Sequence, residues 1–236
     1  MKDDIFSFTD SGTLFDELCR VVHEAAREAV KKRGRFSLAL SGGKTPRALY
    51  ENLAARYRDL IDWRETIVFW GDERFVPADH EESNYRMAAE ALLSRVLIPK
   101  ENVFPVQTTL PTAERAAEAY DRILRLHGVN EGIPRFDLLL LGLGADGHVA
   151  SLFPGSPALH ETGRFAIPAT APEQFAVRER ITVTFPVINS ARRVVLLVTG
   201  EKKRDILERF FKRNTGIPAD RVAPESGVTV FTDIRV

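Results

Sequence analysis

Residues 136–158 read FDLLLLGLGADGHVASLFPGSPA. The stretch opens with a nearly continuous apolar run at 136–141, which is typical of a strand buried on both faces of a parallel sheet. A glycine-rich loop follows, in which three glycines satisfy the pattern G-x-G-x-x-G, and His148 comes directly after the last of them. The loop either binds a dinucleotide or presents a histidine for chemistry.

Dinucleotide binding is the weaker of these two interpretations. A dinucleotide-binding loop opens a long helix and is followed by an acidic residue about 20 residues further on. Here a helix could extend only over 148–153, because Pro154 and Pro157 interrupt it. We therefore expect the loop to present His148, whose imidazole titrates near neutrality as a general acid or base requires. Asp146 would orient that ring or bind a substrate hydroxyl, and the alternative is a surface histidine in a flexible turn.

Apolar and amphipathic segments alternate along the rest of the chain. Further apolar runs lie at 36–40, 66–70 and 193–198, and two other strand patterns lie at 180–185 and 228–231. Apolar residues recur three and four positions apart at 15–29, 49–57, 83–97, 112–127 and 201–211. The alternation predicts an α/β fold with a doubly wound, mostly parallel sheet and helices on both faces. Since the 236 residues contain no repeat or flexible linker, we expect a single domain over 1–236.

Charge and hydropathy patterning exclude several classes of function. The 33 basic residues are balanced by 33 acidic ones, so no overall charge drives binding to nucleic acid or to an anionic membrane. The first ten residues lack the pattern of a secretory signal, and no apolar run approaches the ~18 residues that span a bilayer. We expect a cytoplasmic protein with no nucleic-acid or membrane partner.

Cysteine and histidine usage argues against a metal centre. Cys19 is the only cysteine, which excludes an internal disulfide and a thiolate metal cage and fits a reducing compartment. No two of the five histidines have the spacing of an H-E-x-x-H helix. The sequence also lacks a G-x-S-x-G elbow, which argues against an acyl-serine mechanism. We therefore expect no metal site.

Four segments follow expected strand ends and combine glycine with charged or hydroxyl residues. They are SGGKTP at 41–46, GDERFVP at 71–77, GLGADGH at 142–148 and TGEKK at 199–203. In doubly wound sheets, ligands bind at the carboxyl ends of the strands. The four segments are therefore expected to meet at one binding site.

The first of these segments contains part of a P-loop pattern, but Leu38 stands where that pattern needs its first glycine. The segment still suits an anion, because Gly42 and Gly43 let backbone amides approach a ligand at the positive end of the following helix. We expect Thr45 to be the N-cap of that helix and Pro46 its first residue. The alternative is a plain strand-to-helix turn.

Charged side chains in two other segments also suit an anion. Arg74 could donate two parallel hydrogen bonds to a phosphate while Asp72 or Glu73 orients its guanidinium group. Alternatively, these residues could form a solvated turn. Lys203 is expected in the first turn of a helix, where a cation opposes the helix dipole, so an anion would explain its position. Asn84 stands at the start of another expected helix and could hydrogen-bond a sugar.

Four longer stretches resemble the 6-phosphogluconolactonase family. They are LSGGKTPRALY at 40–50, WGDERFVPADHEESNYRMA at 70–88, FDLLLLGLGADGHVASLFPGSPAL at 136–159 and RITVTFPVINSARRVVLLVTGEKK at 180–203. The resemblance implies a Rossmann-like α/β domain without a metal or organic cofactor. It implies hydrolysis of 6-phospho-D-glucono-1,5-lactone to 6-phospho-D-gluconate, the second step of the oxidative pentose phosphate pathway. Lys44 in the SGG loop and Val149 in place of threonine are slight departures from the family pattern.

Two other functions remain open alongside the lactonase. The related glucosamine-6-phosphate deaminases, which are aldose-ketose isomerases, continue the DGH loop with a phenylalanine-asparagine-glutamate stretch. Here Ser-Leu-Phe-Pro stands at 151–154 without an acid, which favours the lactonase. The fold also serves as a non-catalytic sugar-phosphate-binding domain in some transcription regulators, but no helix-turn-helix segment or basic patch accompanies it here.

The resemblance also implies roles for individual residues. The expected catalytic residues are His148, Asp146 and Asp72, and the expected substrate-binding residues are Gly42, Gly43, Arg74, Asn84, Gly144, Arg180 and Lys203. His148 would take a proton from the water that attacks C1 and then protonate the ring oxygen, while amides of 144–147 stabilise the oxyanion. The phosphate would meet Gly42, Gly43, Arg74 and Lys203, with Arg180 as a further candidate. The partner would be a small sugar-phosphate lactone, and the chain a monomer or homodimer.

Overall fold

The computed structural model describes residues 3–127 and 133–235, and a six-stranded parallel sheet runs through its centre. The strand order is β1-β9-β8-β5-β2-β3, and every neighbouring pair is parallel. The strands are β1 (Asp4–Ser7), β2 (Phe36–Leu40), β3 (Thr66–Trp70), β5 (Leu138–Gly142), β8 (Val194–Val198) and β9 (Val228–Thr232). The expected doubly wound fold class is confirmed, and the four apolar runs of the sequence form β2, β5 and β8 inside the sheet and β3 at its edge.

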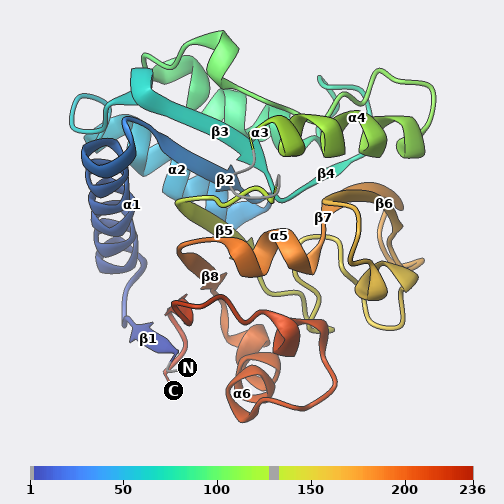
Figure 1. Cartoon of the computed structure of the whole chain (residues 1–236). Coiled ribbons are helices and arrows are strands. Elements are labelled where there is room, and N and C mark those ends of the chain that lie inside the picture. The colour runs from blue at the N-terminus through green and yellow to red at the C-terminus, as the bar shows by residue number, and fades with distance from the viewer. Residues whose placement is uncertain (1–2, 128–132, 236) are drawn as a thin grey trace.

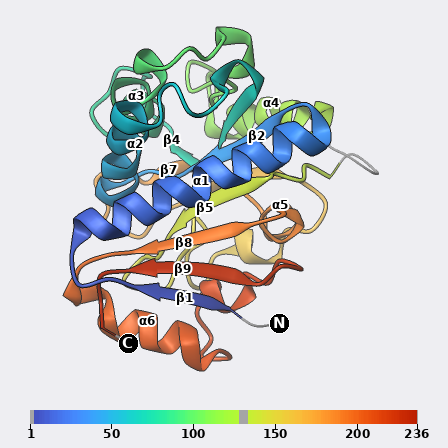
Figure 2. The same ribbon diagram turned by 90° about the vertical axis from the view of Figure 1, so that its left-hand side faces the viewer.

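Helices cover both faces of this sheet, because each inner strand is apolar on both sides (Figures 1 and 2). The helices are α1 (Ser11–Arg33), α2 (Lys44–Arg56), α3 (Asn84–Ala91), α4 (Ala113–Leu126), α5 (Phe185–Ser190) and α6 (Arg204–Lys212). Leu138 and Leu140 pack into the core under α1, α2 and α3. Leu139 and Leu141 pack into the core on the other face, under α4, α5 and α6. The strand that opens 136–158 therefore separates two cores.

The order of the strands places a crevice between β2 and β5. From β2 the chain continues outward to β3, whereas from β5 it continues in the opposite direction to β8 and β9. The two loops that leave β2 and β5 at their carboxyl ends therefore diverge. Such a reversal of strand order is where doubly wound sheets bind ligands.

A second, antiparallel sheet of three strands lies beside α4, in the order β4-β7-β6 (Figure 1). Its strands are β4 (Asp72–Arg74), β7 (Glu179–Val183) and β6 (Ala166–Thr170). The expected strand at 180–185 exists as β7, but it belongs to this sheet, and Phe185 begins α5. The charged triplet of β4 and the proline of β6 hide both strands from a search for apolar runs.

Several expected helix bounds are wrong. The helix expected over 83–97 ends at Ala91 and continues only as a short 3₁₀ turn, Leu93–Arg95. The segment expected over 201–211 begins with a 3₁₀ turn, Glu201–Lys203, before α6. In the described residues no helix is long and apolar enough to cross a membrane.

Candidate functional site

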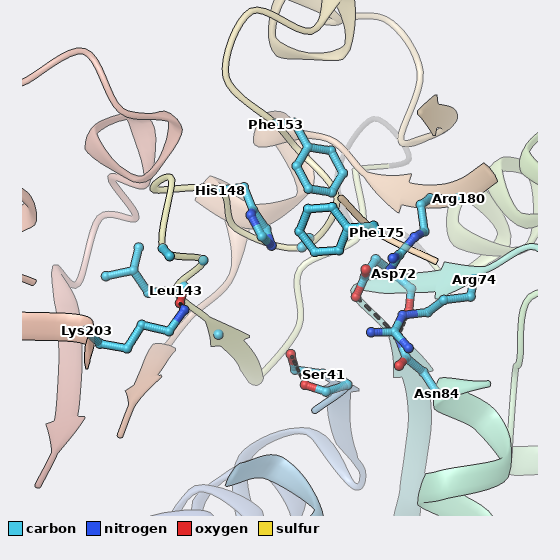
Figure 3. Close-up of a pocket in the computed structure, with 15 residues that line it drawn as sticks. Ser41, Asp72, Arg74, Asn84, Leu143, His148, Phe153, Phe175, Arg180 and Lys203 are labelled. Carbon is cyan, nitrogen blue, oxygen red and sulfur yellow. Dashed lines mark hydrogen bonds between the residues drawn. The ribbon is translucent and has the colours of Figure 1, made fainter. Parts of the chain in front are cut away.

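The four expected strand-end segments line one cavity of about 360 Å³ at the crevice between β2 and β5 (Figure 3). Its lining residues are Ser41, Gly42, Asp72, Arg74, Asn84, Gly142, Leu143, Gly144, Ala145, His148, Ala150, Phe153, Phe175, Arg180 and Lys203. Most expected site residues are among them. Gly43, which is the N-cap of α2, and Asp146 are not, but Asp146 contacts the cavity-lining His148.

His148 is held by Asp146 within the glycine-rich loop. Its Nδ1 lies 2.5 Å from Asp146 Oδ1, and its backbone N–H donates to the same oxygen. Burial raises the pKa of the Asp146 carboxyl, but the hydrogen bond and charge of His148 outweigh that effect, so the pKa is lowered. An ionised Asp146 keeps the proton on Nδ1, which leaves Nε2 as the nitrogen available to a substrate.

Two aromatic rings that the sequence analysis did not single out enclose the imidazole. The centroids of Phe153 and Phe175 lie 4.5 and 5.8 Å from that of His148 (Figure 3). The imidazole side chain stays 18% exposed. His148 is thus neither a buried core residue nor a freely moving surface histidine.

The loop amides near His148 are already used within the loop. Gly144 N–H donates to the carbonyl of His148 at 2.8 Å, and Gly147 N–H donates to the carbonyl of Gly144 at 3.0 Å. These two amides therefore do not form the expected oxyanion hole. Gly144 has a packing role instead, because a Cβ there would lie 2.1 Å from His148 Nδ1. The short segment after His148 forms turns and no helix.

Asp72 is fixed by a buried hydroxyl that the sequence analysis missed. Ser151 Oγ donates to Asp72 Oδ2 at 2.6 Å, and neither side chain is open to bulk solvent. Asn84 Nδ2 donates to the backbone carbonyl of Asp72 at 2.9 Å and lies 3.4 Å from Oδ1. The sequence feature that could have identified Ser151 as a site residue is its position three residues after His148. Its partner, however, lies 79 positions away in the chain.

Glu73 is directed away from the cavity and anchors α3. Its carboxylate accepts hydrogen bonds from the backbone N–H groups of Arg74, Asn84 and Tyr85, each at 2.7 Å. Carboxylates at helix N-termini satisfy amides that have no partner within the helix. The side chain is 2% exposed, and this burial raises the pKa of Glu73 to about 7 despite these bonds.

The raised pKa of Glu73 predicts a pH-dependent loss of stability. Between about pH 4.5 and 7 the carboxyl ionises in the unfolded chain but stays protonated in the folded one. Rising pH therefore favours unfolding, by about 3 kcal/mol over this range at ~1.4 kcal/mol per pKa unit. Urea unfolding of wild type and Glu73→Gln at both ends of the range measures the effect. From pH 4.5 to 7 the free energy of unfolding of the wild type should fall by about 3 kcal/mol more than that of the variant. If the two proteins changed equally with pH, Glu73 would not be the group responsible.

Arg74 and Arg180 lie side by side across β4 and β7, where their Cα atoms are register partners. Arg74 Nη1 donates to the backbone carbonyl of Glu82 at 2.7 Å, and Arg180 Nε donates to the carbonyl of Val177 at 2.9 Å. Arg180 is 4% exposed, and burial followed by the charge of Arg74 lowers its pKa. Arg74 also pairs with Glu82 Oε2 at 3.0 Å, but that carboxylate is 44% exposed, where an ion pair contributes little. Two neighbouring guanidinium groups at a cavity wall therefore favour an anion.

Lys203 lies on the side of the cavity opposite the two arginines (Figure 3). Its Nζ donates to the carbonyl of Leu143 at 2.7 Å. Burial lowers the pKa of Lys203, and the charge of Asp146 opposes that shift. The cavity therefore has cationic groups on two sides.

The SGG turn forms the floor between these cationic sides, with Ser41 at the foot of Figure 3. The N-cap of α2 is Gly43, with φ of 108°, and no side chain caps the helix. The expectation that Thr45 is the N-cap is wrong, because its hydroxyl lies 2.5 Å from that of Thr199 instead. The uncapped amides of α2 suit an anion at this floor.

Gly42 allows the turn to approach Asn84. A Cβ at residue 42 would lie 1.9 Å from Asn84 Oδ1, and Asn84 is held in place by Asp72. We expect Gly42→Ala to lower the free energy of unfolding by about 1–3 kcal/mol, as overpacking does. Chemical denaturation measures this loss, with Gly163→Ala as the control, since its Cβ would meet nothing nearer than 3.6 Å. Equal losses in both variants would contradict a specific steric role for Gly42.

A metal-free reaction stays a prediction. In residues 3–127 and 133–235 no group of three or more histidine, cysteine, aspartate or glutamate side chains is placed to hold a metal ion.

Comparison with known proteins adds a consistent set of relatives. A family model described as glucosamine-6-phosphate isomerases/6-phosphogluconolactonase matches residues 9–231. A 6-phosphogluconolactonase of Synechocystis sp. is 45% identical over 186 residues, which cover 78% of this chain and 75% of that protein. A probable chloroplastic 6-phosphogluconolactonase of Oryza sativa subsp. indica is 39% identical and covers 93% and 71%, respectively.

Solved structures give the same result for the fold. The 6-phosphogluconolactonase from Trypanosoma brucei superposes with a TM-score of 0.86 at 33% identity, covering 98% of this chain and 96% of that one. The enzyme from Thermotoga maritima superposes with a TM-score of 0.86 at 31% identity, covering 98% and 99%. A monomeric glucosamine-6-phosphate deaminase reaches 0.82 at only 19% identity, which shows a shared fold alone.

Proposed function

This chain belongs to the glucosamine-6-phosphate isomerase/6-phosphogluconolactonase family, and we propose that the cavity at the β2–β5 crevice is its active site. The reaction is the hydrolysis of 6-phospho-D-glucono-1,5-lactone to 6-phospho-D-gluconate, a carboxylic ester hydrolysis in the oxidative pentose phosphate pathway. The observation that carries the site assignment is the convergence of one oriented histidine with cationic groups on two sides of a single cavity.

His148 acts as the general base and then as the general acid. Nε2 takes a proton from water while the water oxygen bonds to C1 of the lactone. The bond between C1 and the ring oxygen then breaks, and the imidazolium returns its proton to that oxygen. Asp146 stabilises the imidazolium through the 2.5 Å contact at Nδ1. A lactone is an activated ester, so proton transfer of this kind, worth about 10²–10⁴-fold, suffices without a covalent nucleophile.

The phosphate binds at the floor of the cavity, at the SGG turn. Ser41 and Gly42 line the floor just before the uncapped start of α2, while Arg74 and Arg180 approach from one side and Lys203 from the other (Figure 3). His148 lies at the opposite end of the cavity from Ser41 in this view. A lactone whose phosphate is held at the floor therefore presents C1 to the imidazole, and binding at the remote phosphate orients the reacting carbon.

Asp72 and Asn84 bind hydroxyl groups of the sugar along the cavity wall. Both line the cavity, and Asp72 is kept in place by Ser151. This serine stands where the related deaminases continue the loop without one. At residue 151 this chain therefore has a hydroxyl group that orients the Asp72 carboxylate.

One assay tests the function directly. Acid release from freshly generated 6-phosphogluconolactone is followed with and without the protein, and we expect hydrolysis well above the spontaneous rate. Ammonia release from glucosamine 6-phosphate is measured in parallel and is expected to stay at background. Hydrolysis no faster than in buffer, or ammonia release, would reject the lactonase function.

The compartment and the oligomeric state are also proposals. We place the chain in a reducing compartment such as the cytoplasm, because its single cysteine, Cys19, can form no internal disulfide. The site is built from a single chain, so a monomer or a homodimer would be active. Several plant relatives are chloroplastic.

A further inference from the structure

A second cavity lies at the other end of the parallel sheet, at the amino ends of β2 and β5. It has a volume of about 350 Å³. Among the described residues, four arginines and one carboxylate line it together with Ser37, His127 and apolar side chains; the charged residues are Arg33, Arg35, Arg135, Asp137 and Arg192. We call this cavity the arginine groove.

The sheet topology brings these arginines together from distant parts of the chain. Arg33 ends α1, and Arg35 directly precedes β2. Arg135 stands three residues before β5, and Arg192 two residues before β8. Because β2, β5 and β8 are parallel neighbours, their amino ends lie at the same edge of the sheet. A cation at the end of α1 also complements the helix dipole, but this explains only Arg33.

The single carboxylate does not balance these charges. Asp137 is 6% exposed, and its Oδ2 accepts hydrogen bonds from the N–H and hydroxyl of Ser37 at 2.8 and 2.9 Å. Its Oδ1 lies 2.7 Å from Arg33 Nη2 and 3.3 Å from Arg192 Nε. One buried carboxylate therefore faces two guanidinium groups already, and none of its charge is left for the other two arginines.

Arg35 and Arg135 are the unbalanced cations. Arg35 forms no ion pair with any side chain in the described part of the chain. Of the carboxylates in 3–127 and 133–235, Arg135 pairs only with Glu225, at 3.2 Å, and that carboxylate is 89% exposed, where ion pairs contribute little. Burial and then the charges of Arg33 and Arg135 lower the pKa of Arg192, which reflects the same excess of positive charge.

We propose that the arginine groove binds a small di- or polyphosphate anion, either free or as the ester of an organic group. Guanidinium forks match phosphate oxygens in pairs, and several forks converging on one hollow suit an anion with more than one charged group. The protein has no net charge, so this local excess is not part of a general basic surface. Ser37 of β2 lines the groove and Ser41 lies four residues further along the same strand direction, roughly 13 Å away at ~3.3 Å per residue, so the two sites are distinct.

Isothermal titration with inorganic pyrophosphate at low ionic strength tests the proposal. The decisive variant is Arg35→Ala/Arg135→Ala, which removes the two unbalanced cations and leaves both partners of Asp137. The matched control is Arg58→Ala/Arg115→Ala, which removes two exposed arginines elsewhere. We expect the groove variant to weaken pyrophosphate binding at least about tenfold, and the control variant to stay within about twofold. Lactone hydrolysis should be unchanged in both.

Pyrophosphate could instead enter the lactone cavity, so Arg74→Ala is titrated as well. Its affinity for pyrophosphate should match that of wild type. Absence of binding to wild type, equal weakening in the control variant, or loss in Arg74→Ala with retention in the groove variant would each overturn the proposal. Titration with ADP distinguishes the sources: binding lost in the groove variant indicates an esterified diphosphate, and no ADP binding restricts the site to the free anion. The result is independent of whether the chain hydrolyses the lactone.

Discussion

Replacing His148 with alanine is expected to lower kcat for 6-phosphogluconolactone by about 10²–10⁴-fold, the range that general acid–base catalysis supplies. The variant keeps the cationic groups and the SGG turn, so KM should change little. Initial rates of acid release, corrected for spontaneous hydrolysis, measure both constants. In the proposed mechanism the imidazole acts on the attacking water and the leaving oxygen, and the phosphate binds at the other end of the cavity, so the loss is expected in kcat.

Two companion variants separate chemistry from structure. Asp146→Asn keeps the size of the side chain but removes the charge that holds the Nδ1 proton, so it should lower kcat less than His148→Ala does. His160→Ala removes an exposed histidine outside the cavity and should be as active as wild type. Stability is compared by urea unfolding. Wild-type turnover in a folded His148→Ala protein would remove this residue from the mechanism.

Removing Arg74 or Arg180 is expected to raise KM for the phosphorylated lactone by about 10–100-fold, as losing a charge-assisted hydrogen bond worth about 1.5–3 kcal/mol does. The loss in the double variant should differ from the product of the two single losses, because both groups face the same anion. The diagnostic measurement is the ratio of kcat/KM for 6-phosphogluconolactone and for unphosphorylated gluconolactone. That ratio should collapse in the variants, since only one of the two substrates carries the phosphate.

Removing Arg180 is expected to change stability little. Arg180 is buried next to another cation, so its removal relieves repulsion while leaving a cavity. We expect the unliganded Arg180→Ala protein to unfold within about 1 kcal/mol of wild type. Arg74→Lys keeps the positive charge but loses the planar guanidinium that donates two hydrogen bonds to a phosphate. Its KM should lie between those of wild type and Arg74→Ala. Equal losses on both lactones would show that the pair positions the sugar and does not bind phosphate.

The elements that the sequence predicted well are those with local signals. A strand buried on both faces must be apolar along its whole length, so β2, β3, β5 and β8 can be predicted from sequence without knowing which strands they pair with. The elements that it missed lack such a signal. β4 consists of three charged residues, and it is a strand only because β7 pairs with it. Helix bounds such as the end of α3 depend on packing and escaped the prediction for the same reason.

What the sequence by itself determined is the doubly wound sheet, the histidine at the end of its central strand and the glycines that let the loops close around it. Each of these follows from a few consecutive residues. Only the tertiary structure decided that Arg180 stands beside Arg74, that Ser151 holds Asp72 and that four arginines gather at the far edge of the sheet. Apart from Arg33 and Arg35, these residues lie 57 to 159 positions from one another in the chain. Strand order and register bring them together, and these are properties of the packed chain that no short stretch encodes.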